Sequence, residues 1–289
     1  MTRVPIVCVI AMLLSPNAAR GQEEAASGDD ATAAAARPAV YSAPAEQDEA
    51  WKQDVVVALI GGGVRFRRIH LNVGDGMGGT VPRDFDTGPY FDFAWHLFIR
   101  PLGHRSPRPA IRAMVLQLDG GSSIGLRAER NGISLDANTW RMVGQFGYLY
   151  PIDRWLVGGL LGIGGDVFNI DLNSILPSSR IIYVRLGPAG AVDLVGDFLG
   201  LRADFGLRFP FYLGEIRNTF GQDTRAFGLD STLTLQGRLK AGFTYSFRVV
   251  WEYYTLRFAG PADNVPAMAE GGRGRDHALN LQLLVGWSL

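Results

Sequence analysis

Apolar and polar residues alternate along most of the chain after residue 54. Between Leu201 and Leu213 every odd position is apolar, and the positions between them are mostly charged or small. A helix would spread such charges over all of its faces, whereas a strand collects them on one face. Similar alternation recurs in the segments 91–100, 229–236 and 241–254. The pattern therefore predicts long strands with one apolar and one polar face.

Turn-forming residues divide this region into ten predicted strands. The strands span 54–71, 88–100, 109–127, 133–150, 155–170, 180–194, 200–214, 227–236, 240–258 and 277–289. Ordinary globular strands average about 5–6 residues, whereas a strand that crosses a membrane at a tilt needs roughly 9–11. The lengths favour membrane-spanning strands, and the even number lets the sheet close, with eight or twelve strands as alternatives.

The predicted links between these strands alternate in length. Short links lie near 101–108, 151–154, 195–198 and 237–239. The links near 72–87, 171–179, 215–226 and 259–276 are longer and richer in glycine, proline and charge, and the link at 128–132 is the exception. Short turns at one end and longer loops at the other are the asymmetry expected of a transmembrane barrel.

Apolar residues also alternate along the last predicted strand. They are Leu279, Leu281, Leu283, Val285, Trp287 and Leu289. This ending resembles the C-terminal insertion signal of bacterial outer-membrane β-barrels, although most of those end on an aromatic residue where this chain has Leu289. The resemblance covers residues 54–289. It implies an all-β, closed, antiparallel, up-and-down transmembrane β-barrel that is inserted by the outer-membrane assembly machinery through its C-terminal strand.

Aromatic residues fall near both ends of the predicted strands. Tyr148, Tyr150, Trp155 and Trp287 lie toward the short turns, and Trp140, Trp251 and Tyr253 lie toward the long loops. Tryptophan and tyrosine are enriched at both membrane–water interfaces. We therefore predict that these residues form two belts that face the lipid.

The N-terminal part of the chain differs in composition from the rest. Residues 1–21 contain a basic start, an apolar run and small residues before Gln22, which predicts a cleaved export signal. Residues 22–50 are rich in alanine and carry seven acidic residues against one arginine, which predicts a disordered periplasmic leader. The only cysteine, Cys8, lies in the signal, so no disulfide is expected. We expect the barrel over 51–289 in the outer membrane of a Gram-negative cell.

With the aromatic faces outward, the polar faces of the strands point into the lumen. The predicted polar lumen network comprises Arg65, Arg67, Asp92, His96, Arg100, Arg141, Arg185, Asp193, Arg202, Asp204, Arg208, Asp230, Arg238, Arg248 and Glu252, with Gln145, Tyr183 and Gln236 as neutral members. Charges of both signs can pair across a narrow barrel and fill it, whereas an excess of arginine would suit a narrow, anion-preferring pore. The pattern in 109–127 and 155–170, where glycines crowd the alternation, leaves open which residues face inward.

Candidate chemistry is sparse. His96 and Asp92 lie four residues apart on one strand face and could serve a hydrolase only with a third partner from another strand. The segment 121–125 fits G-x-S-x-G and the segment 74–79 fits G-x-G-x-x-G, but no helix is predicted after either. We expect no cofactor and no metal.

The charge balance limits the classes of partner. The chain has 28 basic and 28 acidic residues, which excludes a nucleic-acid binder driven by bulk charge. We expect outer-membrane lipid as the surroundings, a monomer, and a non-catalytic structural or surface-interaction role. A narrow anion-preferring pore, a barrel-embedded hydrolase and a soluble secreted β-sandwich are the alternatives.

Overall fold

The computed structural model describes residues 55–74, 79–102, 109–130, 133–152, 154–171, 177–196, 198–260 and 271–289. The predicted export signal (1–21) and leader (22–50) lie outside these residues, as does most of the glycine-rich motif at 74–79. Within the described ranges, no helix has the length and hydrophobicity needed to cross a membrane.

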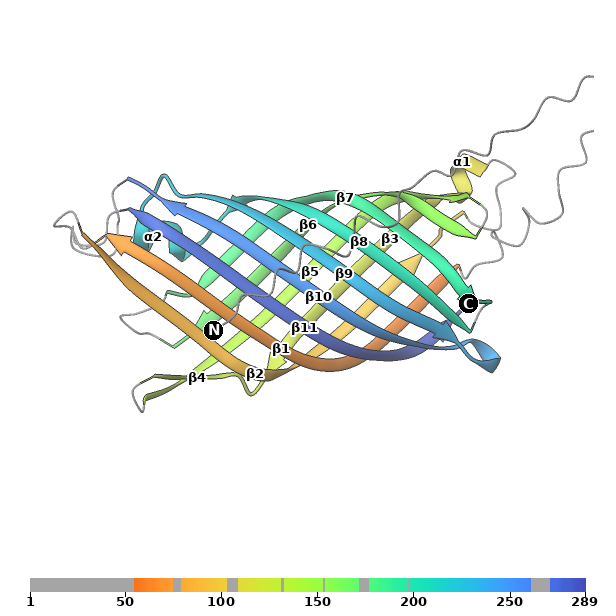
Figure 1. Ribbon diagram of the computed structural model, residues 1–289, viewed down its shortest axis with the longest axis horizontal. Coiled ribbons are helices and arrows are strands. Elements are labelled where there is room, and N and C mark those ends of the chain that lie inside the picture. Colours follow the sequence, from red (N-terminus) through yellow and green to blue (C-terminus); the bar gives the residue numbers. More distant parts are fainter. Residues whose placement is uncertain are drawn as a thin grey trace, which may run out of the picture. The chain divides into compact units, whose positions relative to one another are not determined.

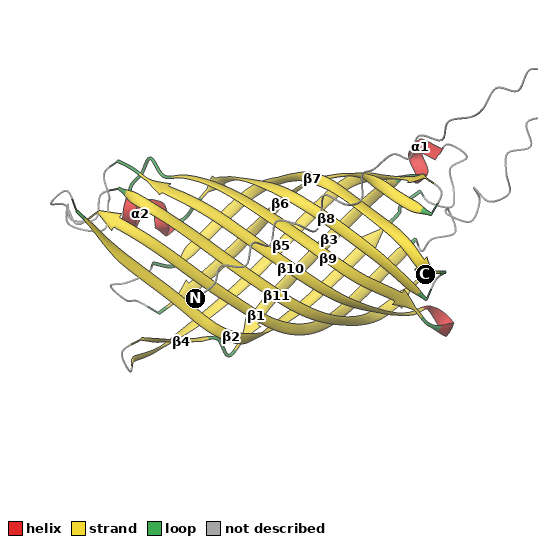
Figure 2. Cartoon of the chain, in the orientation of Figure 1, coloured by secondary structure: helices red, strands yellow, loops and turns green. Residues whose placement is uncertain are grey.

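The described chain forms one closed antiparallel sheet (Figures 1 and 2). Its strands are β1 (Val56–Gly74), β2 (Thr80–Ile99), β3 (Met114–Ile124), β4 (Arg127–Arg130), β5 (Ile133–Ile152), β6 (Trp155–Ile170), β7 (Ser179–Val195), β8 (Leu199–Tyr212), β9 (Arg225–Arg238), β10 (Phe243–Phe258) and β11 (Gly272–Ser288). Strands that follow one another in the chain pair, except β3 and β4, which both pair with β5. The first strand, β1, also pairs with the last, β11. The strands β3 and β4 pair with successive parts of β5 and so occupy one position in the ring. The barrel therefore has ten strand positions around its circumference, which we call walls. The predicted ten-stranded, up-and-down β-barrel is confirmed, and the two-sheet sandwich is wrong.

Several strand boundaries differ from the predicted ones. The predicted link at 72–87 is mostly strand, because β1 runs on to Gly74 and β2 begins at Thr80. The predicted link at 128–132 contains β4, and β11 begins at Gly272 rather than at 277. In the extensions of β1, β2 and β11 most outward positions are polar, so the alternation that marks a membrane-facing strand disappears although the hydrogen-bonded pairing continues.

Three short helices lie between the strands in the part of the chain that the structure describes. The helix α1 (Pro109–Arg112) replaces the start of the strand predicted from 109, with proline at its first position, where a missing N–H is tolerated. A 3₁₀ helix, η2 (Lys240–Gly242), precedes β10. The helix α2 (Glu215–Phe220) lies at the loop end of the barrel and buries Ile216 and Phe220 (Figure 2).

The outward face carries an apolar band that ends abruptly. On β11 the outward residues are apolar from Leu279 to Leu289 and polar from Arg273 to His277. This band has the roughly 9–11 residues that a tilted strand needs to cross a membrane. The seven aromatic residues of the predicted belts all lie on the outward face, and the rings of Trp251 and Tyr253 stack with centroids 6.0 Å apart.

The inward face is arranged in three layers. An apolar layer fills the loop end, where α2 packs and the rings of Phe220 and Phe258 lie 5.0 Å apart. A second apolar layer near the turn end contains Leu59, Phe98 and Leu160. Charged residues occupy the space between the two layers. The core of the protein is thus the filled interior of the barrel, with its polar part in the middle.

Candidate functional site

The centre of the lumen is organised around two buried arginines. Arg185 on β7 reaches Asp230 on β9 at 2.5 Å and Asp204 on β8 at 2.6 Å. Arg208 on β8 binds the other oxygen of Asp230 at 2.6 Å. It also contacts Asp166 on β6 at 2.9 Å. Asp230 therefore holds both guanidinium groups, and each guanidinium has several carboxylate partners, which is the arrangement that makes a buried charge tolerable.

Glu252 on β10 links this cluster to arginines on β1 and β5. One of its oxygens accepts from Arg208 at 2.9 Å, and the other accepts from Arg65 on β1 at 2.6 Å. Arg141 on β5 lies 3.8 Å from the same carboxylate and 3.2 Å from Asp92 on β2. In the ring of strands, β5 and β10 are five positions apart in either direction. The contacts of Arg141 thus bridge the lumen at its full width.

A second bridge lies closer to the turn end. Asp119 on β3 forms an ion pair with Arg248 on β10 and a hydrogen bond with His96 on β2, each at 2.8 Å. Its other oxygen accepts from Gln117 at 2.6 Å, and Gln117 in turn accepts from Arg202 on β8. These residues connect β2, β3, β8 and β10. The lumen is consequently crossed at two levels by hydrogen-bonded side chains.

A separate ion pair stands near the loop end of the network. Arg67 on β1 binds Asp276 on β11 with two hydrogen bonds of 3.0 and 2.6 Å. Its guanidinium also lies 4.8 Å from the ring of Phe168, which belongs to the apolar layer above. This bidentate pair therefore lies at the boundary between the charged layer and the apolar layer.

The spaces left inside the charged layer are small. Three cavities lined by its residues have volumes of about 10, 50 and 10 Å³. A single water needs roughly 10–15 Å³ of such space. The charged layer can therefore hold isolated waters, but these cavities do not form an aqueous channel of the kind seen in wide barrels.

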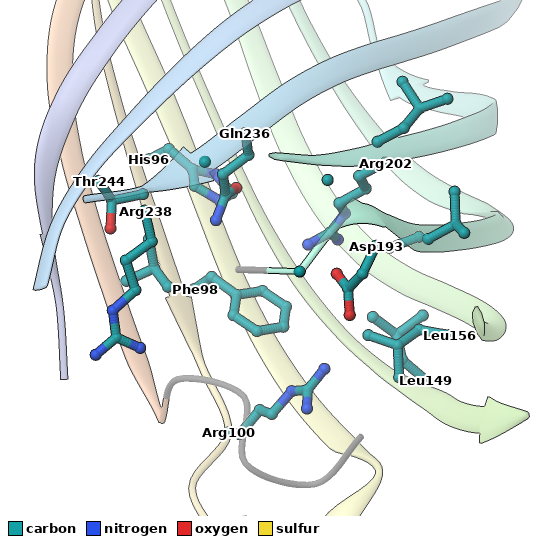
Figure 3. Close-up of a pocket in the computed structure, with 17 residues that line it drawn as sticks. His96, Phe98, Arg100, Leu149, Leu156, Asp193, Arg202, Gln236, Arg238 and Thr244 are labelled. Atoms are coloured by element: carbon teal, nitrogen blue, oxygen red, sulfur yellow. The ribbon is translucent and has the colours of Figure 1, made fainter. Parts of the chain in front are cut away.

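A larger cavity of about 370 Å³ lies at the turn end, and we call it the turn-end vestibule (Figure 3). Its lining includes His96 and the charged residues Arg100, Asp193, Arg202 and Arg238, together with apolar residues such as Phe98 and Leu156. The guanidinium carbon atoms of Arg100 and Arg202 lie 5.6 and 5.0 Å from the ring centroid of Phe98. The vestibule is thus a polar pocket in which Phe98 packs against two arginines. At its inner end lie residues of the second bridge.

The structure separates the residues of the predicted lumen network into two groups. Eleven of the fifteen take part in the contacts described above: Arg65, Arg67, Asp92, His96, Arg141, Arg185, Asp204, Arg208, Asp230, Arg248 and Glu252. The other four, Arg100, Asp193, Arg202 and Arg238, line the turn-end vestibule. Among the neutral members, Gln145 binds Arg185 and Tyr183 lies under Arg208.

Sequence reasoning missed three of the carboxylates that pair with these arginines. Asp119 and Asp166 lie on β3 and β6, where glycines on both faces hide the alternation, and Asp276 precedes the predicted start of the last strand. The inward position of Asp119 could have been inferred from its spacing. It lies two residues after Gln117 and four after Val115, and all three side chains face inward. Glycine serves a purpose on β6, since a Cβ at Gly164 would lie 2.6 Å from the ring of Tyr183.

His96 does not pair with Asp92, the carboxylate considered from the sequence. It contacts Asp119, whereas Asp92 accepts from Arg141 and Asn280. The side chain of His96 is almost fully buried, and none of its described hydrogen bonds involves a serine, threonine or cysteine. Within the described residues, no group of three His, Cys, Asp or Glu side chains is placed to hold a metal ion.

A closed barrel with an apolar outward band, aromatic belts and a polar interior belongs to the class of outer-membrane β-barrel proteins. No protein-family model and no curated protein matches the sequence.

Solved structures with a similar fold include the outer-membrane protease OmpT from Escherichia coli, with 10% sequence identity, a TM-score of 0.49, and coverage of 81% of this chain and 96% of that chain. A FadL homologue from Pseudomonas aeruginosa has 8% identity and a TM-score of 0.30, with 82% and 91% covered. An outer-membrane channel from Pseudomonas putida F1 has 11% identity and a TM-score of 0.38, with 79% and 95% covered. Likeness at this level does not bear on activity.

Proposed function

We propose that this protein is an integral outer-membrane β-barrel with a solid lumen, and that it acts through its surfaces rather than as a pore or an enzyme. The observation that carries the proposal is the bridge from Arg141 on β5 to Glu252 on the opposite wall, within a network to which all ten walls contribute. Charged side chains that neutralise each other across the lumen occupy the path that an ion would take.

The alternative of a narrow anion-preferring pore needs free cationic groups along a continuous path. Arg65, Arg185 and Arg208 each have a carboxylate within 3 Å, so they offer little field to a passing anion. Buried apolar residues around α2 also line the interior at the loop end, where an ion would meet no charged group to replace its hydration. These observations favour a filled barrel over a conducting one.

The alternative of a barrel-embedded hydrolase rests on His96. A general base must lie within hydrogen-bond reach of the group that it activates. The described contact of His96 is instead a hydrogen bond with Asp119, which also pairs with Arg248. We therefore assign His96 to the polar core.

A chloride-influx experiment tests the proposal. The full-length protein is reconstituted into phosphatidylcholine vesicles that contain a chloride-sensitive dye, and its insertion is verified by a heat-dependent shift in gel mobility. We expect inserted protein without chloride entry above that of empty vesicles. Chloride entry that rises with the amount of inserted protein would show a pore, and a protein that stays in the aqueous phase would contradict the membrane assignment itself.

A further inference from the structure

The chain enters the barrel beside the turn-end vestibule. The backbone N–H of Val55 donates to the carbonyl oxygen of Leu289 at 2.7 Å, and the carbonyl oxygen of Val55 accepts from the backbone N–H of Arg100 at 2.7 Å. Two residues further on, Val57 lines the vestibule. The residues that precede Val55 therefore begin at the rim of this cavity.

Basic side chains dominate the described lining of the vestibule. Three arginines from different strand ends stand around the ring of Phe98 in Figure 3: Arg100, Arg202 and Arg238. Among the described residues that line the cavity, Asp193 is the one with a carboxylate. The described partners of Arg202 are neutral, because Gln117 accepts a hydrogen bond from its guanidinium group and Phe98 lies against it. The lining thus suits a negatively charged occupant.

The same excess of positive charge extends over the whole turn end. The short links and the strand ends that flank them lie in the ranges 100–112, 151–154, 193–202 and 236–244, which together contain eight basic and three acidic residues. This count includes the parts of the links that lie outside the described residues, so the excess holds wherever their side chains point. Positive charges gathered at one end of the barrel repel each other, and an acidic segment nearby relieves that repulsion.

The chain carries such a segment directly before the point where it enters the barrel. Three of the four residues 46–49 are acidic, namely Glu46, Asp48 and Glu49, and we call these four residues the acidic stretch. An extended chain spans at most about 3.3–3.6 Å per residue, so Glu49 can reach about 20 Å from Val55 and Glu46 about 30 Å. Arg100 is bonded to Val55 itself and therefore lies within this reach. A partner tethered so closely has an effective concentration in the millimolar range, at which weak ion pairs suffice for binding.

We propose that the acidic stretch binds in the turn-end vestibule, with its carboxylates against Arg100, Arg202 and Arg238. The cavity of about 370 Å³ falls in the range of about 300–1,000 Å³ in which proteins bind ligands, and it is large enough for a few side chains. Its apolar walls, which include Leu149 and Leu156, suit the methylene groups of glutamate and glutamine. The proposal holds whether or not the lumen conducts ions, because it concerns only the mouth of the barrel.

The experiment measures a disulfide cross-link between the acidic stretch and the vestibule. The chain from Gln22 onward contains no cysteine, so Gln47→Cys and Gln236→Cys can be introduced as a pair. Gln47 lies among the acidic residues, and Gln236 lines the vestibule. The protein is folded in detergent, and copper phenanthroline oxidises the two thiols. We expect a cross-link within one chain, and high salt should slow its formation because salt screens the ion pairs.

Charge variants show whether ion pairs hold the acidic stretch in place. Adding E46Q/D48N/E49Q should slow the cross-linking by roughly five- to tenfold, the combined effect of three ion pairs of surface strength. Adding R238Q alone should slow it by about twofold, and R238Q should have no further effect once the three carboxylates are gone. The matched control E23Q/E24Q/D29N removes the same charge far from Val55 and should leave the rate unchanged.

A second control places the barrel cysteine out of reach. Thr255 pairs with Arg275, which lies fourteen residues along β11 from Leu289, or about 46 Å. The eight residues from position 47 to Val55 span at most about 29 Å. The pair Q47C/T255C should therefore form no cross-link within one chain.

Equal cross-linking rates with and without the three carboxylates would overturn the proposal, and so would equal slowing by E23Q/E24Q/D29N. A cross-link that forms only between two chains would assign the vestibule to a second copy instead. A rate that responds to low concentrations of inorganic phosphate but not to the carboxylates would assign it to an anion from solution. Heat-dependent gel mobility before oxidation shows whether each variant has folded, which separates failure of this site from failure of the barrel.

Discussion

Glu252 is the residue whose replacement tests the packed lumen most sharply. Its two oxygens hold Arg208 at 2.9 Å and Arg65 at 2.6 Å, and Arg141 lies 3.8 Å away. The variant Glu252→Gln keeps the size and one acceptor oxygen of the side chain but removes the charge. We expect the barrel to insert and to lose stability, because buried arginines remain without their counter-charge.

The size of this effect follows from what each arginine retains. Arg208 keeps Asp230 and Asp166, and Arg141 keeps Asp92. Among the described residues, Glu252 is the one carboxylate within ion-pair distance of Arg65. The Nε atom of Arg65 already lacks a hydrogen-bond partner there. The loss therefore falls mainly on one buried guanidinium, which costs about 3–5 kcal/mol when its partner is removed. The amide oxygen of glutamine places the expected value near the lower limit, about 3 kcal/mol.

Urea unfolding in phosphatidylcholine vesicles measures this loss as a change in the free energy of unfolding. The double variant E252Q/R65M supplies the control, since it removes the stranded guanidinium and should recover most of the stability. A loss below about 1 kcal/mol for E252Q, the value of a solvent-exposed pair, would refute the reasoning. It would show that Arg65 and Glu252 are hydrated and that the lumen is wet.

Three further predictions concern other parts of the barrel. Leu283→Arg places a charge in the middle of the apolar band and should lower the free energy of unfolding in vesicles by about 2–4 kcal/mol. Thr255→Arg, which lies beyond the band, should lower it by less than about 1 kcal/mol. Equal losses of stability in the two variants would argue against the band. His96→Ala should leave the lipid composition of producing cells unchanged, and a changed lipid profile would revive the hydrolase. Outside the band, hydrogen bonds from Arg68 and from the backbone N–H of Gly88 lower the pKa of Asp86, so this pair stabilises the fold at neutral pH and loses its effect as the pH falls below about 4. Asp86→Asn should thus cost at most about 1 kcal/mol at pH 7, and this cost should shrink as the pH falls below about 4; a cost that does not change on acidification would contradict this.

The extent to which the sequence predicts this barrel depends on how clearly each strand alternates. The segment 201–213 alternates without interruption, and β8 places its arginines and aspartate inward as expected. On β6, the glycines around Gly164 mark neither an apolar nor a polar face, so the pattern could not show that Asp166 faces inward. The hairpin of β1 and β2 continues beyond the band with polar residues on its outward face, which made it look like a loop.

The contacts between strands lie beyond what the alternation can show. The pattern assigned Arg141 and Glu252 to the lumen, but only the closed ring places β5 and β10 on opposite walls. His96 illustrates the same limit, because its neighbour on the same strand was the natural partner to consider and its actual partner, Asp119, comes from β3. The two-residue alternation shows which face of the sheet a residue occupies. The strand register and the width of the barrel decide which other side chains that residue contacts.

The central claim is that a membrane-inserted barrel of this chain has a closed lumen, and single-channel recording in planar bilayers tests it most directly. The sample is folded protein extracted in detergent and verified by its heat-dependent gel mobility. We predict insertion without resolved conductance steps in chloride solutions, for the wild type and for His96→Ala alike. Reproducible unitary conductance steps from the folded wild-type protein would contradict the claim and would show that the charged layer opens to ions.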